Sequence, residues 1–331
     1  MHSRPIALGK TSFEITRVGL GAWAIGGGEW QGGWGPQDDS DSIAAIHHSV
    51  ALGVNWIDTA PAYGLGRAEQ VVGEALRQLP KADRPLVFTK CGLVWKEGAR
   101  TVSNSLAPAS IRRECEDSLR RLRVDVIDLL QAHWPTEDGT PLEESWSTMA
   151  ALVDEGKVRH IGLSNFTVED LETCEAIRHV DTFQPQLNLL VRDALSETIP
   201  WCAAHDTGVI VYSPMRSGLL SGRFTAERAA NLPDDDWRKT AQDFQPPMLD
   251  RNLQLVDRLK PIADRLGATL PELAIAWTLK QPGVTGAIVG ARAPEQVDGW
   301  ANSADVELQD KDLDEISQAL AETGAGEGPT P

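Results

Sequence analysis

Four polar residues that could together transfer a proton lie at or just beyond the ends of short apolar segments. Asp58 closes one such segment, and Tyr63 follows it after a proline-containing loop. Lys90 and His133 close the next two apolar segments of the chain. Because the carboxyl ends of parallel strands meet on one side of a sheet, we expect these four side chains to converge.

The chemistry that such a group could perform is general acid catalysis at a carbonyl. A free phenol has a pKa near ~10, and a neighbouring ammonium stabilises the phenolate and lowers that pKa. We therefore expect Lys90 to lower the pKa of Tyr63, and Asp58 to pair with Lys90. His133 would hydrogen-bond the carbonyl oxygen, so that the group protonates a carbonyl that is gaining a hydride. One polar residue at a strand end more often caps a loop, but four complementary ones are difficult to explain in that way.

Eight apolar segments that read as strands alternate with segments of helical periodicity, which predicts a closed (β/α)8 barrel, a TIM barrel. A doubly wound sheet is disfavoured because no GxGxxG follows any of the segments. We predict a hairpin over residues 6–15 before the barrel, extra helices towards the C-terminus, and one domain over residues 1–331. Residues 324–331 are expected to form a flexible tail. The predicted strands are residues 16–21, 56–58, 86–90, 126–133, 160–164, 182–186, 209–212 and 287–289.

Composition narrows the classes of partner. The formal net charge of −17 disfavours nucleic acid and acidic membranes, whose phosphates the protein would repel. The four cysteines form no CxxC pair, which suits a reducing compartment and predicts no metal site. No apolar run reaches membrane-spanning length, and the first residues lead into no apolar segment of a signal peptide. We therefore expect a cytoplasmic protein.

Along nearly its whole length the sequence resembles the aldo-keto reductases. It is most similar to the bacterial branch that includes the inositol-operon and general-stress reductases. The resemblance implies reduction of an aldehyde or ketone to an alcohol, and it places the family's catalytic residues on Asp58, Tyr63, Lys90 and His133. The motifs that carry it are GLGAWAIGG, IDTAPAYG, TKCG, IDLLQAHWP, GKVRHIGLSNF, QPQLNLL, VYSPMRSGLLSGR and IVGARAPEQV.

The same resemblance implies a nicotinamide cofactor lying across the barrel mouth. Ser164, Asn165 and Gln186 match the residues that hold its carboxamide, and Tyr212 matches the ring that stacks on the nicotinamide. A serine and an asparagine also suit a primary amide, which needs both a donor and an acceptor. The other positions implied to contact the cofactor are Gly21, Ala22, Trp23 and Asp58; Ser213, Pro214, Met215, Arg216, Gly218, Leu219, Ser221 and Arg223 in the pyrophosphate clamp; and Gly290, Ala291, Arg292 and Gln296 near the adenosine.

The adenosine end departs from the common pattern of the family. Many members have a basic residue where Gly290 stands and an arginine where Gln296 stands. They also carry a Glu-Asn pair in place of Gly299 and Trp300. Arg292 remains to bind a 2′-phosphate, so the sequence favours NADPH and leaves NADH possible.

Six tryptophans in loops or at strand ends are expected to line the substrate pocket. Indole faces cover rings and indole N–H groups bind hydroxyls, so we predict a cyclic, sugar-like or aromatic carbonyl substrate. Two other functions stay open: a nucleotide-sensing regulatory protein with slow turnover, and a polyol or sugar dehydrogenase working in the oxidative direction. The sequence leaves the physiological substrate and the oligomeric state open. The six tryptophans are Trp23, Trp30, Trp34, Trp95, Trp134 and Trp237.

Overall fold

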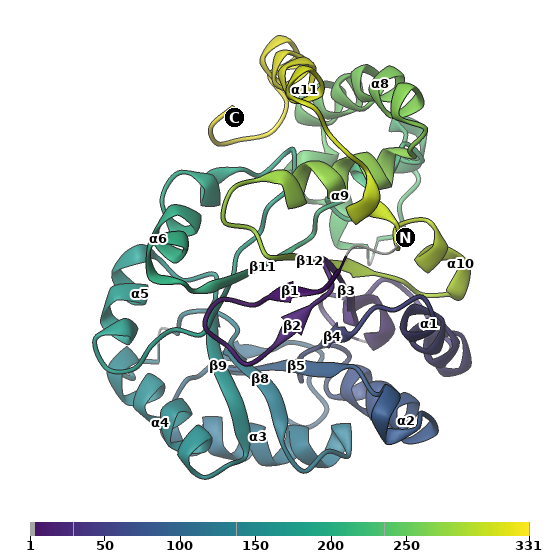
Figure 1. Cartoon of the computed structure of the whole chain (residues 1–331). Helices are drawn as coiled ribbons and strands as arrows, with labels where there is room; N and C mark the ends of the chain where they lie inside the picture. The colour runs from purple at the N-terminus through teal and green to yellow at the C-terminus, as the bar shows by residue number, and fades with distance from the viewer. Residues whose placement is uncertain (1–3, 29, 137, 235, 331) are drawn as a thin grey trace.

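The computed structural model describes residues 4–28, 30–136, 138–234 and 236–330, and it confirms the predicted (β/α)8 barrel. Eight parallel strands pair in the circular order β10-β11-β12-β3-β4-β5-β8-β9, and β10 pairs with β9 to close the ring. Figure 1 shows these strands at the centre of the molecule with helices around them. The barrel strands are β3 (Val18–Gly21), β4 (Trp56–Asp58), β5 (Leu86–Cys91), β8 (Ile127–Ala132), β9 (Val158–Ser164), β10 (Thr182–Gln184), β11 (Gly208–Tyr212) and β12 (Gly286–Gly290).

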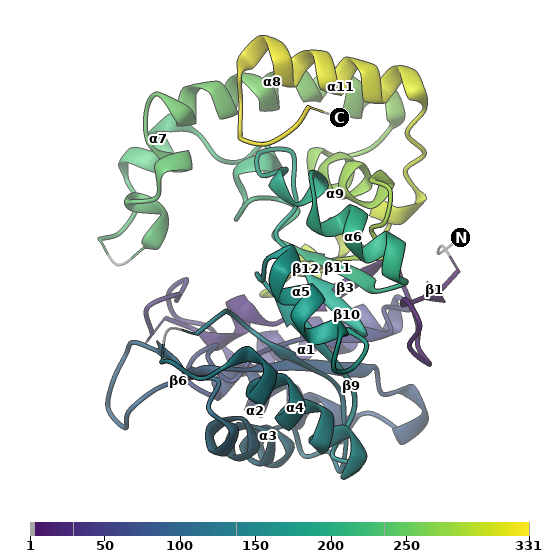
Figure 2. The ribbon, with the colours of Figure 1, turned by 90° about the vertical axis from the view of Figure 1, so that its left-hand side faces the viewer.

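Helices follow the strands, and several of them begin with residues that commonly cap or start a helix. Thr167 and Thr269 each form a capping box at the start of a helix, and Pro108 occupies a first-turn position where no amide hydrogen is needed. Figure 2 shows α8 and α11 side by side, away from the strands, on the side of α9. The helices are α1 (Asp39–Ala51), α2 (Arg67–Gln78), α3 (Pro108–Leu122), α4 (Leu142–Asp154), α5 (Val168–Glu175), α6 (Thr198–His205), α7 (Ala226–Ala230), α8 (Met248–Leu266), α9 (Leu270–Lys280), α10 (Pro294–Asp298) and α11 (Asp310–Thr323).

Two small hairpins accompany the barrel. Strands β6 (Leu93–Val94) and β7 (Ser103–Asn104) form an antiparallel pair in the segment that follows β5. The predicted N-terminal hairpin is present as β1 (Ile6–Ala7) and β2 (Glu14–Ile15). Its apolar side chains fill the barrel interior at the end opposite to the strands' carboxyl ends, so only the carboxyl end remains for a site. This cluster contains Leu8, Phe13, Ile15, Trp56, Phe88, Leu129, Ile210 and Ile288.

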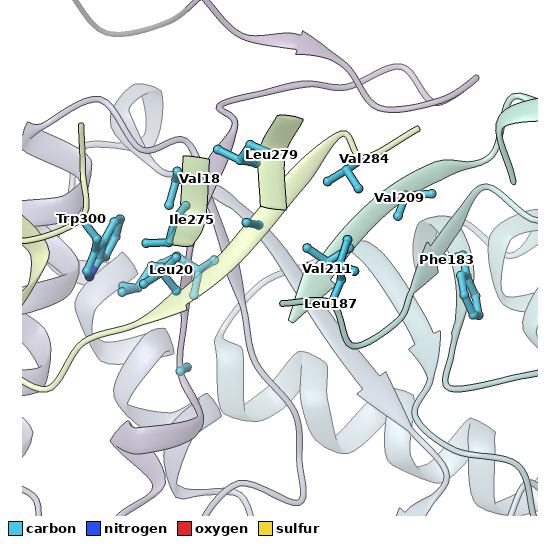
Figure 3. Packing of buried hydrophobic residues seen from close by; sticks show 14 of the residues in the cluster. Val18, Leu20, Phe183, Leu187, Val209, Val211, Ile275, Leu279, Val284 and Trp300 are labelled. Atoms are coloured by element: carbon cyan, nitrogen blue, oxygen red, sulfur yellow. The ribbon is translucent and has the colours of Figure 1, made fainter. Parts of the chain in front are cut away.

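A second, larger apolar cluster lies between the strands and the helices. Figure 3 shows Val18 and Leu20 of β3 near Ile275 of α9, all within this cluster. Trp300 is 2% exposed and belongs to the same cluster, so its indole packs in the core.

The C-terminal residues differ from the expected flexible tail. After α11 the chain turns back towards the barrel, as Figure 1 shows. The backbone N–H of Arg192 donates to the carbonyl of Glu327 (3.0 Å), and the N–H of Glu327 donates to the carbonyl of Leu190 (2.9 Å). Residues 325–330 are therefore bound to the segment that follows β10. None of the helices in the described ranges is long and apolar enough to cross a membrane.

Candidate active site

The four polar residues at the strand ends converge as the sequence predicts. Lys90 Nζ donates to the carboxylate of Asp58, to the carbonyl of Thr59 (3.0 Å) and to the hydroxyl of Tyr63 (3.4 Å). The imidazole of His133 lies edge-on to the phenol of Tyr63, with ring centroids 5.7 Å apart. Lys90 is completely buried and Asp58 is 2% exposed, so this ion pair lies out of water.

A tight turn holds Tyr63 in place. The loop after β4 bends so that Tyr63 N–H donates to the carbonyl of Ala60 (3.2 Å) and Ala68 N–H donates to that of Tyr63 (3.1 Å). Gly64 has a φ of 62°, and a Cβ there would lie 2.1 Å from the carbonyl oxygen of Gly26. Only glycine permits this approach, which presses the loop against the 3₁₀ helix η1 (Trp23–Gly26).

Two buried glutamines complete the environment of Asp58, and sequence reasoning missed both of them. The amide nitrogens of Gln184 and Gln131 donate to Asp58 Oδ2 (2.8 and 3.4 Å), and Gln184 also donates to Gln131 Oε1 (3.2 Å). The available signal was a polar residue inside an apolar strand segment. Gln184 is also the glutamine that contacts Ser164, whose hydroxyl donates to its carbonyl (2.9 Å). Gln186, which the resemblance placed beside Ser164 and Asn165, is half-buried, and its backbone forms an isolated parallel β-bridge with Tyr212.

Burial dominates the ionisation of three of the four catalytic candidates, Tyr63, Lys90 and His133. Burial raises the pKa of Tyr63 well above its usual value, and the charge of Asp58 raises it further. Burial and Asp58 therefore outweigh the lowering of this pKa expected from Lys90. Burial also lowers the pKa of Lys90, against the pull of Asp58. Burial and the charge of Lys90 hold the pKa of His133 well below its usual value, so the imidazole is neutral near pH 7.

Polar groups suited to a carboxamide lie beside this cluster. Asn165 has a φ of 68°, and its amide nitrogen donates to the carbonyl of His133 and to the hydroxyl of Ser164 (both 3.0 Å). The hydroxyl of Tyr212 donates to Asn165 Oδ1 (2.8 Å). Ser164, Asn165 and Tyr212 thus form one hydrogen-bonded unit, made of groups of the types that can bind an amide.

The loop after β11 has several residues with a left-handed backbone. Ser213, Arg216 and Ser217 have φ values of 60°, 45° and 52°, and the following Gly218 is also left-handed. The backbone N–H groups of Arg216 and of residues 218–221 donate to carbonyls of the same loop, which stabilises this conformation. The serine and arginine side chains of the loop are of the types that bind a pyrophosphate, as the resemblance implies. Arg216 forms an ion pair with Asp243.

Arg292 contacts a neighbouring loop. Its guanidinium donates to Gln37 Oε1 (2.6 Å), to the carbonyl of Trp34 (3.2 Å) and to the carbonyl of Pro36. Its backbone N–H donates to Gln296 Oε1 (2.8 Å). Each nitrogen of the guanidinium thus has a protein partner, and the arginine joins the loop after β12 to the loop after β3.

Four of the six predicted tryptophans gather near the site. The ring of Trp23 stacks on Trp237 (centroids 6.0 Å apart) and meets Trp34 edge-on (5.8 Å), while Trp30 lies 6.0 Å from the ring of Tyr63. The indole nitrogens of Trp30, Trp34 and Trp237 are buried without a hydrogen-bond partner among the described residues. Of the remaining two, Trp95 is half-buried and Trp134 is 42% exposed.

The class of protein to which this barrel and the polar cluster at its mouth belong follows from comparison with known protein families. The aldo/keto reductase family matches residues 17–321, and the chain belongs to that family. Nicotinamide cofactors and small carbonyl substrates are characteristic of the family. Within the described ranges, no group of three or more His, Cys, Asp or Glu residues could hold a metal ion.

Similar proteins include both reductases and a dehydrogenase. The aldo-keto reductase YhdN of Bacillus subtilis is 36% identical over 96% of this chain and 93% of its own length. The NADH-specific methylglyoxal reductase of Escherichia coli is 35% identical over 96% and 99%. The structure of the glycerol dehydrogenase AKR11B4 from Gluconobacter oxydans superposes with a TM-score of 0.89, at 36% identity, over 99% of this chain and 98% of that one.

Proposed function

We propose that the protein reduces an aldehyde or ketone to an alcohol with a nicotinamide cofactor, and that Tyr63 is the proton donor. The observation that carries the proposal is the position of the Tyr63 hydroxyl, 3.4 Å from the buried ammonium of Lys90 and next to His133. A protonated phenol beside a fixed positive charge and a neutral imidazole is suited to a carbonyl that becomes an alkoxide.

Each residue of the cluster has a distinct part in the reaction. When bound, a reduced nicotinamide supplies the hydride that adds to the carbonyl carbon. Tyr63 gives its proton to the carbonyl oxygen, and the ammonium of Lys90 stabilises the phenolate that remains. Asp58 and its two glutamine partners hold Lys90 in position, while the neutral His133 orients the carbonyl oxygen by a hydrogen bond.

Cofactor oxidation in the presence of a panel of aldehydes tests this proposal directly. Rapid turnover would support an enzyme, whereas very slow turnover with tight cofactor binding would favour a nucleotide-sensing protein. Oxidation of alcohols is the second candidate function, and the similarity to a glycerol dehydrogenase favours it. The same residues catalyse both directions, since Tyr63 as a phenolate would accept the proton of an alcohol.

We propose a hydroxylated or ring-containing carbonyl compound as substrate, on the basis of the tryptophans at the mouth. Glyceraldehyde and propanal have equal chain length and differ in hydroxyl groups, so they isolate the contribution of hydrogen bonds to the substrate hydroxyls. We expect kcat/KM for glyceraldehyde to exceed that for propanal by about tenfold, the effect of one or two hydrogen bonds. Benzaldehyde should also exceed propanal, because indole faces cover a ring.

Trp30 is the residue to change, because its indole lies beside Tyr63 and its N–H is unpaired. Trp30→Phe should reduce kcat/KM for glyceraldehyde by about 2–10-fold and leave that for propanal less affected. Equal activity of the wild-type enzyme on propanal and the two other aldehydes would contradict a selective pocket.

For the cofactor we propose that both NADPH and NADH are used, with weak discrimination between them. The partners of Arg292 in the loop after β3 support this proposal, as does the NADH-specific relative. Because Arg292 ties two loops at the mouth, Arg292→Ala should weaken both cofactors alike, within about threefold of each other.

Measured Kd values for NADPH and NADH check this expectation. Gln296→Arg supplies the arginine that many family members carry, and it should favour NADPH by about tenfold, as expected for a charged hydrogen bond to phosphate. Selective loss of NADPH in the Arg292 variant would show instead that this arginine binds the 2′-phosphate.

A further inference from the structure

Arg192 is a buried cation whose guanidinium is surrounded by carbonyl groups. It is 3% exposed, and its side chain donates to the carbonyl oxygens of Leu189, Ala325 (3.5 Å), Gly328 (3.2 Å) and Pro329 (2.7 Å). Three of these four carbonyls come from the C-terminal tail, residues 325–330. A buried charge is costly unless its donors are satisfied, so the docked tail is part of what stabilises Arg192.

The tail is shaped for this contact. Gly326 and Gly328 have φ values of 69° and 91°, which favour glycine. A Cβ on Gly326 would lie 2.5 Å from the backbone of Leu190, and one on Gly328 would lie 2.7 Å from that of Arg192. The side chain of Ala325 is 2% exposed and belongs to the larger apolar cluster, so the tail also makes an apolar contact with the core.

The segment that receives the tail also supports the loop after β11. Asn188 is completely buried, and its Oδ1 accepts from the N–H groups of Leu190 (2.9 Å) and Val191 (3.0 Å). Its amide nitrogen donates to the carbonyl of Ser213 (3.0 Å). Ser213 is the strained, left-handed first residue of the loop that we assign to the pyrophosphate, so Asn188 fixes the point where that loop leaves the strand.

We infer that the C-terminal tail is a positioning element for the cofactor: it fixes residues 188–192, and through Asn188 it holds the loop that begins at Ser213. The inference depends on the proposed function, because it assigns that loop to the cofactor. Arg192 and Asn188 act through the loop, and we assign neither of them a contact with substrate.

Two neighbouring positions in the tail provide a matched test. Gly326→Val introduces a side chain that collides with Leu190, whereas Glu327→Val changes an exposed side chain whose residue contributes only its backbone to the docking. We expect Gly326→Val to raise the Kd of NADH or NADPH, measured by quenching of tryptophan fluorescence, by about 3–10-fold. Glu327→Val should stay within about twofold of wild type. At saturating cofactor, kcat and the KM for the carbonyl should change by less than about twofold in both variants.

Asn188→Ala tests the same connection with the tail unchanged, and it remains informative if Gly326→Val does not fold. The Kd of its cofactor should rise by a similar ~3–10-fold. In the double variant Gly326→Val/Asn188→Ala, the loss of cofactor-binding free energy should be smaller than the sum of the two single losses. A lower Tm with unchanged cofactor Kd in these variants would overturn the inference and leave a purely structural tail. Failure of the wild-type protein to bind either cofactor would instead refute the proposed function itself.

Discussion

Replacement of Tyr63 by phenylalanine is expected to lower kcat by about 10²-fold or more, the range for loss of a general acid. Phenylalanine keeps the ring that packs near His133 and Trp30 and removes only the hydroxyl. Cofactor Kd should therefore stay close to that of wild type. Because the pKa of Tyr63 is raised well above its usual range, the donor stays protonated across the neutral range, and its ionisation should not limit kcat there.

The second tyrosine of the chain is a useful comparison for this variant. Tyr212→Phe removes the hydroxyl that donates to Asn165. It should mainly weaken cofactor binding, by about 2–10-fold, with kcat at saturating cofactor much less affected.

Retention of more than about a tenth of wild-type kcat by the Tyr63→Phe variant would rule out Tyr63 as the acid.

Replacement of Lys90 by methionine is expected to abolish measurable reduction and to destabilise the fold. The variant removes the charge beside Tyr63 and leaves the carboxylate of Asp58 buried without its cation. Breaking a buried ion pair in this way costs about 3–5 kcal/mol in the free energy of unfolding. Chemical denaturation and steady-state assays measure the two effects separately.

A double variant separates stability from catalysis. Asp58→Asn together with Lys90→Met removes both charges, and the asparagine can still interact with Gln184. We expect the free energy of unfolding to recover by at least about half of the loss, while activity stays absent. Recovery of activity along with stability would mean that Lys90 has only a structural role.

The catalytic candidates could be placed from the sequence because Asp58, Lys90 and His133 close apolar segments and Tyr63 follows one after a short loop, and parallel strands share one carboxyl end. The two glutamines could not be placed in that way. β8 and β10 are not neighbours of β4 in the barrel, so Gln131 and Gln184 reach Asp58 only across its closed interior. A lone amide in an apolar segment gives no indication of that partner.

Three other features depend on distant packing. The raised pKa of Tyr63 results from burial, which no local pattern reveals. Arg292 meets a loop more than two hundred residues earlier in the chain, and Arg192 meets the tail. The glycine-rich sequence after α11 predicts a flexible tail, but Gly326 and Gly328 are the residues that let the tail approach Leu190 and Arg192 closely.

The most direct test of the central claim is isotope transfer. The protein is incubated with nicotinamide cofactor deuterated at the transferable position and with an aldehyde substrate, and the product alcohol is analysed by mass spectrometry. We predict an alcohol that carries deuterium on the former carbonyl carbon, formed by the wild-type enzyme and nearly absent with the Tyr63→Phe variant. Product without deuterium, or equal deuterated product from both proteins, would contradict the assignment of this site.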